Sequence, residues 1–449
     1  NKGELSNFSR SIDKIVKNEL CVVCGVCTLE TTSSMQWNKL GFLEPAEKSN
    51  VEVNYKLCPF NITPDDEVKT EDELAEIFLN TAPNSQAKAD HYYNTYRGYA
   101  KEFRTTSSSG GLATYVLCTL LDNKQIDYVV SVGESKGLNS HYTYKISRTR
   151  EELLQTSKTK YYPVSMSEAL KQMEQLDGKG AIVGTACFVK AIRLLQYYKP
   201  EFKEKIQFIV GIICGGQKSK FYADFLSSHL GLGDKKYKQP QFRIKDKTSY
   251  ALDYSFGAKD FEGKKHTLKM RGLGDMWGTG VFKNNACDFC DDVTTELADI
   301  SLGDAWIKPY SEDGEGNNVV VTRSFLAEQI INDGIKKGSL QIEKLPFDSF
   351  LQSQQGSFNH RHKGLKYRIR LKRKKGQLIS PKRHDKESIR FDFKMVQRQR
   401  LRTRTLSLDS WVKGGRVEYN KVMPRQLRLL RVKTRFNHYI RAVKRRLSL

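Results

Sequence analysis

A run of closely spaced cysteines near the start of the chain constrains the fold more than any other sequence feature. Cys21, Cys24 and Cys27 are each three residues apart, and Cys58 follows at a distance with Pro59 directly after it. Such a run can wrap three corners of a cubane while the distant cysteine closes the fourth, as in a ferredoxin-type 4Fe-4S cluster. Zinc could use the same thiolates, but zinc sites more often combine two separated Cys-x-x-Cys pairs. The spacing favours one iron-sulfur cluster here.

A second Cys-x-x-Cys pair opens the stretch ACDFCDDVTTELADISLGDAW, residues 286–306. Cys287 and Cys290 supply half of a metal site, and a tetrahedral or cubane site needs four thiolates. Cys118 lies in a helical apolar pattern, which leaves Cys187 and Cys214 as the remaining pair.

Cys187 and Cys214 each follow a β-branched apolar run, residues 181–186 and 206–213. Residues 189–198 have helical spacing, so the unit is predicted to be strand, helix and parallel strand. Since parallel strands place their carboxyl ends at one edge of a sheet, these cysteines can converge with the pair in the second stretch. The alternative is that Cys187 and Cys214 are ordinary buried cysteines, with the other pair a zinc half-site or no site.

The length of the chain and its use of cysteine indicate how many domains it has and which compartment suits it. A chain of 449 residues with 39% hydrophobic residues predicts two to four domains with a sizeable core. Clustered cysteines indicate metal ligation in a reducing compartment rather than disulfides. No run approaches about 18 apolar residues, and the first residues lack a signal-peptide core, so we expect a cytoplasmic protein.

The net charge of +24 is concentrated in the C-terminal part. Residues 357–449 contain 30 Lys and Arg against 5 Asp and Glu, so the rest of the chain is close to neutral. The excess positive charge is therefore expected to belong to an appendage.

Within this basic tail, residues 424–449 carry apolar residues at steps of three or four. The stripe consists of Leu429, Val432, Phe436, Ile440, Val443 and Leu447. The pattern predicts a basic amphipathic helix that lies on an anionic membrane surface. A helix packed on the body or on another subunit is an equal alternative. Specific RNA binding is disfavoured because no known fold motif or aromatic stacking platform accompanies the charge.

A serine- and glycine-rich turn precedes a predicted helix. Ser107, Ser108, Ser109, Gly110 and Gly111 lead into an apolar helical pattern. Backbone N–H groups at such a helix start can bind a phosphate, although serine is also simply a good N-cap. Residues 126–132 are predicted to form the next strand.

Further candidates for phosphate binding lie in a basic segment and at a glycine-bearing strand end. The basic segment contributes Lys158, Lys160 and Tyr161, and the strand end contributes Gly184 and Thr185. Lysines are more often simply solvated. Asp304, at the end of the strand predicted over residues 298–302, is a candidate for orienting a flavin or substrate group, with a turn-capping aspartate as the alternative.

Taken in order, these motifs resemble the flavin and iron-sulfur β-subunits of coenzyme F420-reducing hydrogenases and dehydrogenases, and the related 7-hydroxymethyl chlorophyll a reductase. The resemblance rests on CxxCGxC with a later CysPro, SSSGG, SKxKYY, GTACF, GIICGG and CDFCDD with ADISLGDAW, and covers roughly residues 18–310. The chain departs from the usual pattern at Ala186, where relatives usually have proline, and in lacking a histidine after Cys214, which leaves the substrate open.

The resemblance implies FAD and two 4Fe-4S clusters, with FAD near the SSSGG, SKxKYY and GTAC segments. Because clusters pass single electrons and a flavin delivers pairs, such a protein converts one-electron to two-electron transfer. We expect a ferredoxin-like donor and an organic substrate, in a setting of bacterial surface polysaccharide synthesis. The alternatives are a deazaflavin-dependent oxidoreductase, an electron-relay subunit without its own substrate, and a zinc-bearing nucleic-acid binder.

The expected fold class is α+β or α/β in three parts. Residues 1–90 form a small ferredoxin-like iron-sulfur segment, residues 91–350 an α/β body that binds FAD and the second cluster, and residues 351–449 a basic, partly amphipathic helical tail. The tail suggests peripheral contact with the inner face of a membrane, and self-association is left open.

Overall fold

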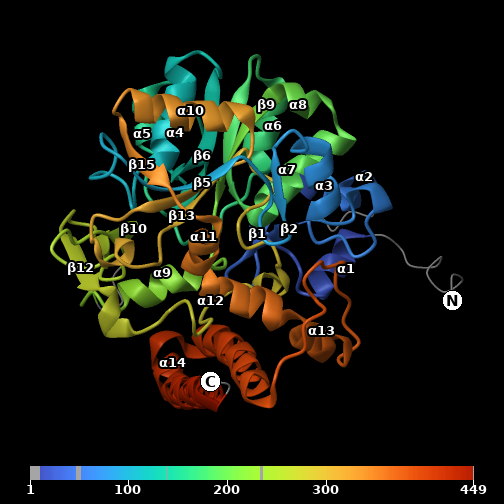
Figure 1. Ribbon diagram of the computed structural model, residues 1–449. Coiled ribbons are helices and arrows are strands. Elements are labelled where there is room, and N and C mark those ends of the chain that lie inside the picture. Colours follow the sequence, from blue (N-terminus) through green and yellow to red (C-terminus); the bar gives the residue numbers. More distant parts are fainter. Residues whose placement is uncertain (1–10, 47–51, 138, 233–235, 448–449) are drawn as a thin grey trace, which may run out of the picture.

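An eight-stranded mixed sheet forms the centre of the computed structural model, which describes residues 11–46, 52–137, 139–232 and 236–447 (Figure 1). The strand order is β15-β5-β14-β13-β9-β8-β6-β7. In that order the strands are β15 (Leu340–Lys344), β5 (Asn94–Ala100), β14 (Asn318–Thr322), β13 (Ile300–Asp304), β9 (Ile206–Ile212), β8 (Gly180–Thr185), β6 (Tyr128–Glu134) and β7 (Tyr142–Ser147). The mixed α/β class expected from the sequence is confirmed.

The middle of this sheet is parallel. β6 pairs with β8, β8 with β9, and β9 with β13 in parallel registers, whereas β14 and β7 run antiparallel to their neighbours. Helix α7 (Ala186–Tyr198) makes the predicted crossover from β8 to β9. It begins three residues earlier than its apolar spacing indicates, because Thr185 is the last extended residue and the chain turns directly into the helix. Cys187 therefore lies in the first turn of α7 rather than at the end of a strand.

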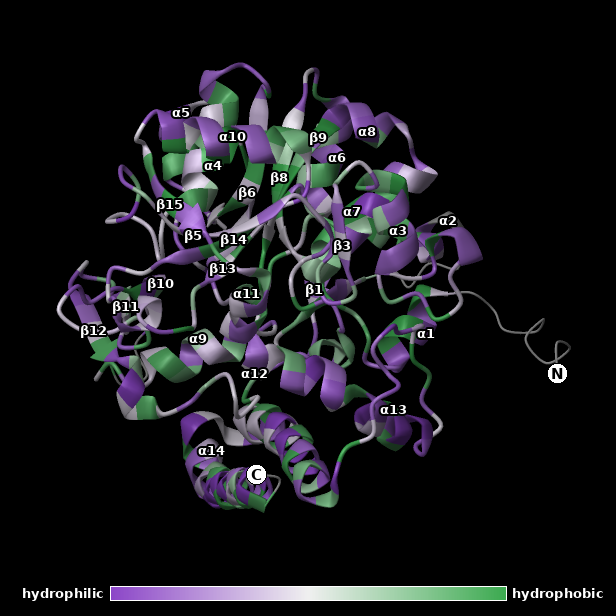
Figure 2. Cartoon of the chain, in the orientation of Figure 1, coloured by the Kyte–Doolittle hydropathy of each residue, from purple (hydrophilic) through white to green (hydrophobic). Residues whose placement is uncertain are grey.

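Helices cover both faces of the sheet. On one face, α4 (Leu112–Asp122), α5 (Arg150–Leu154) and α10 (Phe325–Lys336) share an apolar core with β5, β9 and β13. On the other, α6 (Ser167–Gln175) and α7 pack with the N-terminal segment. Figure 2 shows hydrophobic residues along the central strands and hydrophilic residues on the outer helix surfaces, as burial of apolar surface requires.

The N-terminal segment is built from short elements. They are α1 (Ile12–Lys17), β1 (Met35–Trp37), β2 (Leu43–Pro45), α2 (Glu52–Lys56), α3 (Glu71–Phe78), β3 (Asn84–Gln86) and β4 (Asp90–Tyr92). Helix α3 starts with a capping box between Thr70 and Glu73. Its buried residues join the core beneath α7, so this segment packs directly on the body.

A smaller antiparallel sheet and two more helices complete the body. The elements are α8 (Glu201–Lys205), α9 (Lys220–Ser227), β10 (Lys238–Ile244), β11 (Ser255–Lys259) and β12 (Lys265–Lys269). The aromatic rings of Phe242, Phe256 and Tyr222 pack together between this sheet and α9.

The C-terminal part is entirely helical in its regular elements. It contains α11 (Phe347–Ser353), α12 (Gln355–Phe358), α13 (Leu365–Arg373) and α14 (Phe391–Leu447). Helix α14 is interrupted at Gly414 and Gly415, whose backbone angles are not helical, and so consists of two arms. Among the described helices none is long and apolar enough to cross a membrane.

Much of this basic part is packed against the body, which its charge pattern does not predict. Arg368 of α13 is fully buried, and the first arm of α14 places Arg404 3.0 Å from Asp288. Ser407 accepts a hydrogen bond from the N–H of Phe282 at 2.9 Å. Some of the positive residues counted as an appendage are thus interior groups, because they pair with the acidic stretch after Cys287.

Candidate functional site

The N-terminal cysteines meet around one small cavity. Cys21, Cys24, Cys27 and Cys58 all line it, together with apolar side chains that include Ile12, Ile15, Val22 and Met35. The cavity lies among α1, the loop that follows it and Cys58, the second residue after α2. The structure thus brings together the four thiols that the spacing singles out, in apolar surroundings that exclude water.

The backbone of the cysteine loop is forced into conformations that side chains rarely adopt. Val23 has a φ of 72°, which is strained for a β-branched residue, and Gly25 has a φ of 78°. A Cβ at Gly25 would lie 2.1 Å from Ser165 Oγ, so only glycine fits there. Strain of this kind is typical of ligand-binding loops, where surrounding structure holds the chain in place.

Burial makes three of these thiols reluctant to ionise. It raises the pKa of Cys24 to about 12, and it raises the pKa values of Cys27 and Cys58 well above the ordinary value, with the neighbouring thiolates adding to the effect. Four crowded thiolates become favourable only with a cation among them. Metal binding is the usual solution, since it deprotonates thiols outright.

The second set of cysteines also converges, from three separate parts of the chain. Cys187 comes from the first turn of α7, Cys214 lies two residues after β9, and Cys287 and Cys290 come from the short 3₁₀ turn Asn285–Phe289 and its end. Burial raises the pKa of Cys187 well above its ordinary value, and the nearby Cys290, Cys287 and Cys214 raise it further. The carboxyl ends of β8 and β9 thus supply two of the four sulfurs.

Each sulfur of this second set has a polar neighbour of its own. The N–H of Gly216 donates to Cys214 Sγ and the N–H of Gln217 to Cys287 Sγ, both at 3.2 Å. Thr185 Oγ1 lies 3.7 Å from Cys187 Sγ, and Arg361 Nη1 lies 3.7 Å from Cys290 Sγ. Hydrogen bonds to sulfur are the means by which proteins stabilise and tune iron-sulfur clusters.

Buried cations surround the second set. Arg361 and Arg368 come from the region after residue 350, and Lys283 lies beside Asp288, which also contacts Arg404. Although burial alone would raise the pKa of Asp288, Lys283, His360 and Arg404 lower it well below its usual range.

Arg368 itself is short of partners. It is fully buried, its Nη2 has no hydrogen-bond partner among the described residues, and burial lowers its pKa to about 10. A buried guanidinium that lacks a full set of partners is costly unless negative charge lies close by. Asp288 supplies one such charge, and a four-thiolate cluster would add to it.

The two cysteine sets are joined by hydrogen bonds. Asn284 Nδ2 donates to the carbonyl of Cys21 at 3.0 Å and to Gln217 Oε1 at 2.9 Å, and the N–H of Gln217 is the donor to Cys287 Sγ. A cavity between the sets is lined by Pro59, which follows Cys58, and by Cys187 and Cys290. The sets therefore lie close to each other across a short, buried path.

Two of the loops expected to hold phosphate lie side by side at the carboxyl edge of the sheet. Ser108 Oγ accepts a hydrogen bond from the N–H of Thr159 at 2.9 Å, which joins the Ser107–Gly111 turn to the loop that carries Lys158, Lys160 and Tyr161. Thr185, in contrast, faces Cys187, and with Gly184 it lies at the end of β8 beside the second cysteine set.

The glycines of the Ser107–Gly111 turn have a structural explanation. A Cβ at Gly110 would lie 2.6 Å from Asn318 Oδ1, and one at Gly111 would meet Phe103 at 2.8 Å. The first N–H of α4, that of Leu112, is directed to Asn318 Oδ1 at 3.3 Å. This helix start is therefore partly occupied by the protein itself, which weakens the phosphate interpretation drawn from the sequence.

Asp304 lies at the end of β13, as predicted, and is ion-paired. Its Oδ2 lies 2.6 Å from Arg243 Nη1, a partner that the sequence did not suggest because β10 supplies it from a distant part of the chain. Tyr161, whose ring packs against Trp277, belongs to the same neighbourhood. Asp304 Oδ1 and Arg243 Nε are buried without partners among the described residues, so an acceptor and a donor are available to a polar ligand.

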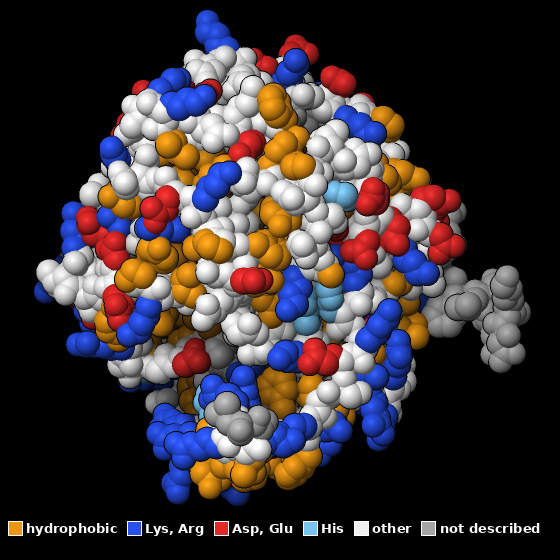
Figure 3. All heavy atoms as spheres, viewed as in Figure 1, with side chains coloured by type: hydrophobic (Ala, Val, Ile, Leu, Met, Phe, Trp, Pro, Cys, Tyr) orange, Lys and Arg blue, Asp and Glu red, His pale blue; other side chains and the backbone are white. Residues whose placement is uncertain are grey.

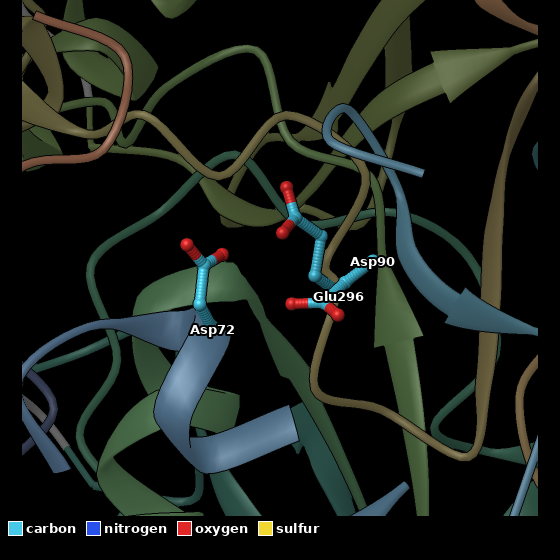
Figure 4. Close-up of side chains that lie close together, drawn as sticks. All are labelled: Asp72, Asp90 and Glu296. Carbon is cyan, nitrogen blue, oxygen red and sulfur yellow. The ribbon is translucent and has the colours of Figure 1, made fainter. Parts of the chain in front are cut away.

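Three acidic side chains from separate parts of the chain lie close together, as Figure 4 shows. Carboxylate oxygens of Asp72, Asp90 and Glu296 lie within 4.8 Å of one another. Arg383 contacts two of them: its Nη1 donates to Asp72 at 2.9 Å and to Glu296 at 2.5 Å. The trio is therefore an ion-pair network that ties α3 to the acidic stretch after Cys290, and the guanidinium occupies the place of a cation.

Two family models match this chain, and both describe the beta subunit of coenzyme F420 hydrogenase/dehydrogenase. Residues 95–171 match the model of its N-terminal region, and residues 177–347 match the model of its C-terminal region. Together these matches cover more than half of the chain.

Similar sequences come from methanogenic archaea. A coenzyme F420-dependent sulfite reductase of Methanocaldococcus jannaschii is 23% identical over 75% of this chain and 50% of its own length, so the chain spans about half of that relative. A coenzyme F420 hydrogenase subunit beta of Methanococcus voltae is 27% identical over 60% of this chain and 94% of its own. In the solved F420-reducing [NiFe] hydrogenase complex of Methanosarcina barkeri, one chain superposes with a TM-score of 0.48 at 20% identity, covering 64% of this chain and 96% of that one.

Proposed function

Because the chain belongs to the coenzyme F420 hydrogenase/dehydrogenase beta-subunit family, we propose that it is an iron-sulfur oxidoreductase component that exchanges electrons with coenzyme F420. The observation that carries the proposal is the arrangement of eight cysteines as two sets of four, linked through Gln217 and Asn284. Two such sets beside each other suit a path for electrons rather than two isolated structural metals.

Each set of cysteines would hold one 4Fe-4S cluster. The ligands of the first are Cys21, Cys24, Cys27 and Cys58, and those of the second are Cys187, Cys214, Cys287 and Cys290. Clusters of this kind supply one-electron transfer. The protein's part is to exclude water from the first set with apolar side chains, and to balance the negative charge of the second with Arg361, Arg368 and Lys283.

A flavin such as FAD is the group we propose at the carboxyl edge of the sheet. It supplies the exchange between single electrons and the electron pair of a hydride, which a deazaflavin requires. Arg243 Nε and Asp304 Oδ1 are the unpaired buried groups that would bind its polar atoms, and Lys160 would bind phosphate. Asp304 would thus contact the flavin through Oδ1 and hold Arg243 in place through Oδ2.

The relatives' names bear on the choice of partner. Both sequence relatives carry coenzyme F420 in their names, and the hydrogenase relative is named as one subunit of its enzyme. We therefore place deazaflavin exchange, or electron relay to a partner subunit, before the ferredoxin-driven reduction of an organic substrate in polysaccharide synthesis. This chain matches only half of the sulfite reductase relative. We propose that a separate partner protein would supply the catalytic part that corresponds to the other half.

The test uses full-length protein reconstituted anaerobically with iron, sulfide and FAD. Reduced coenzyme F420 is mixed with the protein and a one-electron dye, and the return of oxidised F420 is followed by absorbance. We expect turnover in the wild type and in Cys118→Ala, whose thiol lies outside both sets, and none in Cys187→Ser. Flavin reduction by reduced ferredoxin but not by reduced F420 would reject the F420 assignment in favour of the ferredoxin-driven alternative.

A further inference from the structure

The second arm of α14, residues 416–447, packs against the body and the first arm through a mixed inner side, in which Tyr419, Met423 and Leu430 are buried together with two polar residues. The arm doubles back after the break at Gly414 and Gly415 and runs antiparallel to the first, as the two red helices at the lower end of Figure 1 show. Gln399 Nε2 donates to Gln426 Oε1 at 3.0 Å, and Asn437 Nδ2 donates to Asp392 Oδ2 at 2.7 Å. Gln426 and Asn437 are buried.

The apolar stripe of this arm faces outward instead. Val432 is 58% exposed, Phe436 40%, Tyr439 66% and Leu447 81%, and Leu429 continues the same stripe one turn earlier. A surface helix of a globular protein normally turns such a stripe toward the core. Figure 3 shows hydrophobic side chains along the lowest edge of the molecule, where α14 lies, with Lys and Arg beside them. The stripe is therefore available to something outside the chain.

The charges beside the stripe are all of one sign. Residues 424–447 contain nine Arg and Lys and no Asp or Glu. In the described part of the chain no carboxylate pairs with Arg425, Arg428, Arg431 or Arg435, all of which are exposed. An exposed apolar stripe bordered by unpaired positive charges suits an occupant that is both apolar and negatively charged.

We propose that the second arm of α14 binds the surface of an anionic lipid bilayer, with the stripe from Leu429 to Leu447 inserted at the level of the headgroups. Its 32 residues form a rod about 48 Å long that would lie in the plane of the membrane. The flanking arginines would contact lipid phosphates. Binding of a second copy of the chain to this face is less favourable, because the positive charges of the two identical faces would repel each other.

The test measures co-flotation of the full-length protein with lipid vesicles. We expect binding to vesicles that contain phosphatidylglycerol, weak binding to phosphatidylcholine alone, and loss of binding at high salt. The affinity of the double variant Val432→Asp/Phe436→Asp for vesicles that contain phosphatidylglycerol is expected to fall by a factor of about ten or more. Phe325→Asp is the matched control, because Phe325 is equally exposed, at 60%, but lies on α10. It should bind as the wild type does.

Several results would overturn the proposal. The proposal fails if the wild-type protein does not bind anionic vesicles. It also fails if the double variant binds them as tightly as the wild type does. A dimer in solution that the double variant converts to a monomer, without any vesicle binding, would assign the face to a second copy. The visible spectrum and circular dichroism of each variant report whether the body has kept its fold. Since the assay does not depend on electron transfer, its outcome is separate from that of the proposed function.

Discussion

Arg361 Nη1 lies 3.7 Å from Cys290 Sγ, and the same guanidinium also donates to the carbonyls of Asp292 and Cys214. One buried cation from the helical C-terminal region thus holds two of the three chain segments that form the second cysteine set. This contact makes the region after residue 350 part of the candidate redox site.

Removing this charge is expected to change the potential of the second cluster. Arg361→Gln takes a positive charge away from the sulfurs, and since reduction adds negative charge, the reduction potential should fall by about 50 mV. The measurement is a redox titration followed by electron paramagnetic resonance. Arg361→Lys keeps the charge and should recover part of the shift. Arg370→Gln, an exposed arginine on α13, is the control. Equal potentials in all three variants and the wild type would refute the role of Arg361.

Lys160 is expected to make the proposed flavin binding dependent on pH. Its Nζ donates to the carbonyl of Ser157 at 2.6 Å, and burial lowers its pKa to about 7. As pH rises through 7 the free protein loses this positive charge, so binding of an anionic flavin must take up a proton and should weaken between pH 7 and 9, by at most about tenfold per unit. In Lys160→Met the affinity should be lower and flat over this range, as measured by fluorescence titration.

The exposed Lys158 supplies the control for that experiment. Lys158→Met should keep a pH dependence and move it to slightly higher pH, because the exposed Lys158 contributes to lowering the pKa of Lys160. An affinity in Lys160→Met that still falls as pH rises would show that another group is responsible.

Asp90 is predicted to destabilise the protein at neutral pH. Burial raises its pKa to about 6, so the folded state binds more protons than the unfolded state between pH 4 and 6, and stability falls as pH rises through that window. The charged groups that face it are Arg383, Asp72, His91, Arg323 and Glu296. Asp90→Asn should raise the free energy of unfolding by about 1–2 kcal/mol at pH 7.5 and by little at pH 4, with asparagine accepting the positive φ of 55°.

Urea denaturation at the two pH values measures this difference. Asp66→Asn, at an exposed carboxylate of the same segment, should leave it unchanged. A stabilisation by Asp90→Asn that is the same at both pH values would mean that the ionised carboxylate is not its cause.

The sequence was sufficient to predict the parallel unit around α7, because β-branched runs broken by glycine and a helical spacing between them follow from local geometry. It also predicted that Cys187 and Cys214 could converge, since they follow neighbouring parallel strands, although it left ordinary buried cysteines as an alternative. The sequence predicts Cys187 at the end of a strand, whereas this residue lies in the first turn of α7. The boundary between a strand and a helix depends on a single turn, which has no periodic pattern.

The groups around the cysteines could not be found in this way. Arg361 and Arg368 contribute to the positive charge of the C-terminal part. A net charge does not show which of the contributing residues are buried. The partner of Asp304 is Arg243, which lies 61 positions away on another sheet. Contacts of this kind depend on tertiary packing and leave no local signal. The outward stripe of α14 was visible as a pattern, but only the polar contacts between its arms show which way it faces.

The most direct test of the account is the iron and acid-labile sulfide content of the wild type and three variants purified anaerobically. The wild type and Cys118→Ala should each hold about eight irons per chain, whereas Cys27→Ser and Cys187→Ser should each hold about four, from different clusters by electron paramagnetic resonance. About four irons in the wild type, unchanged by Cys187→Ser, would contradict the account by leaving the second cysteine set without a cluster.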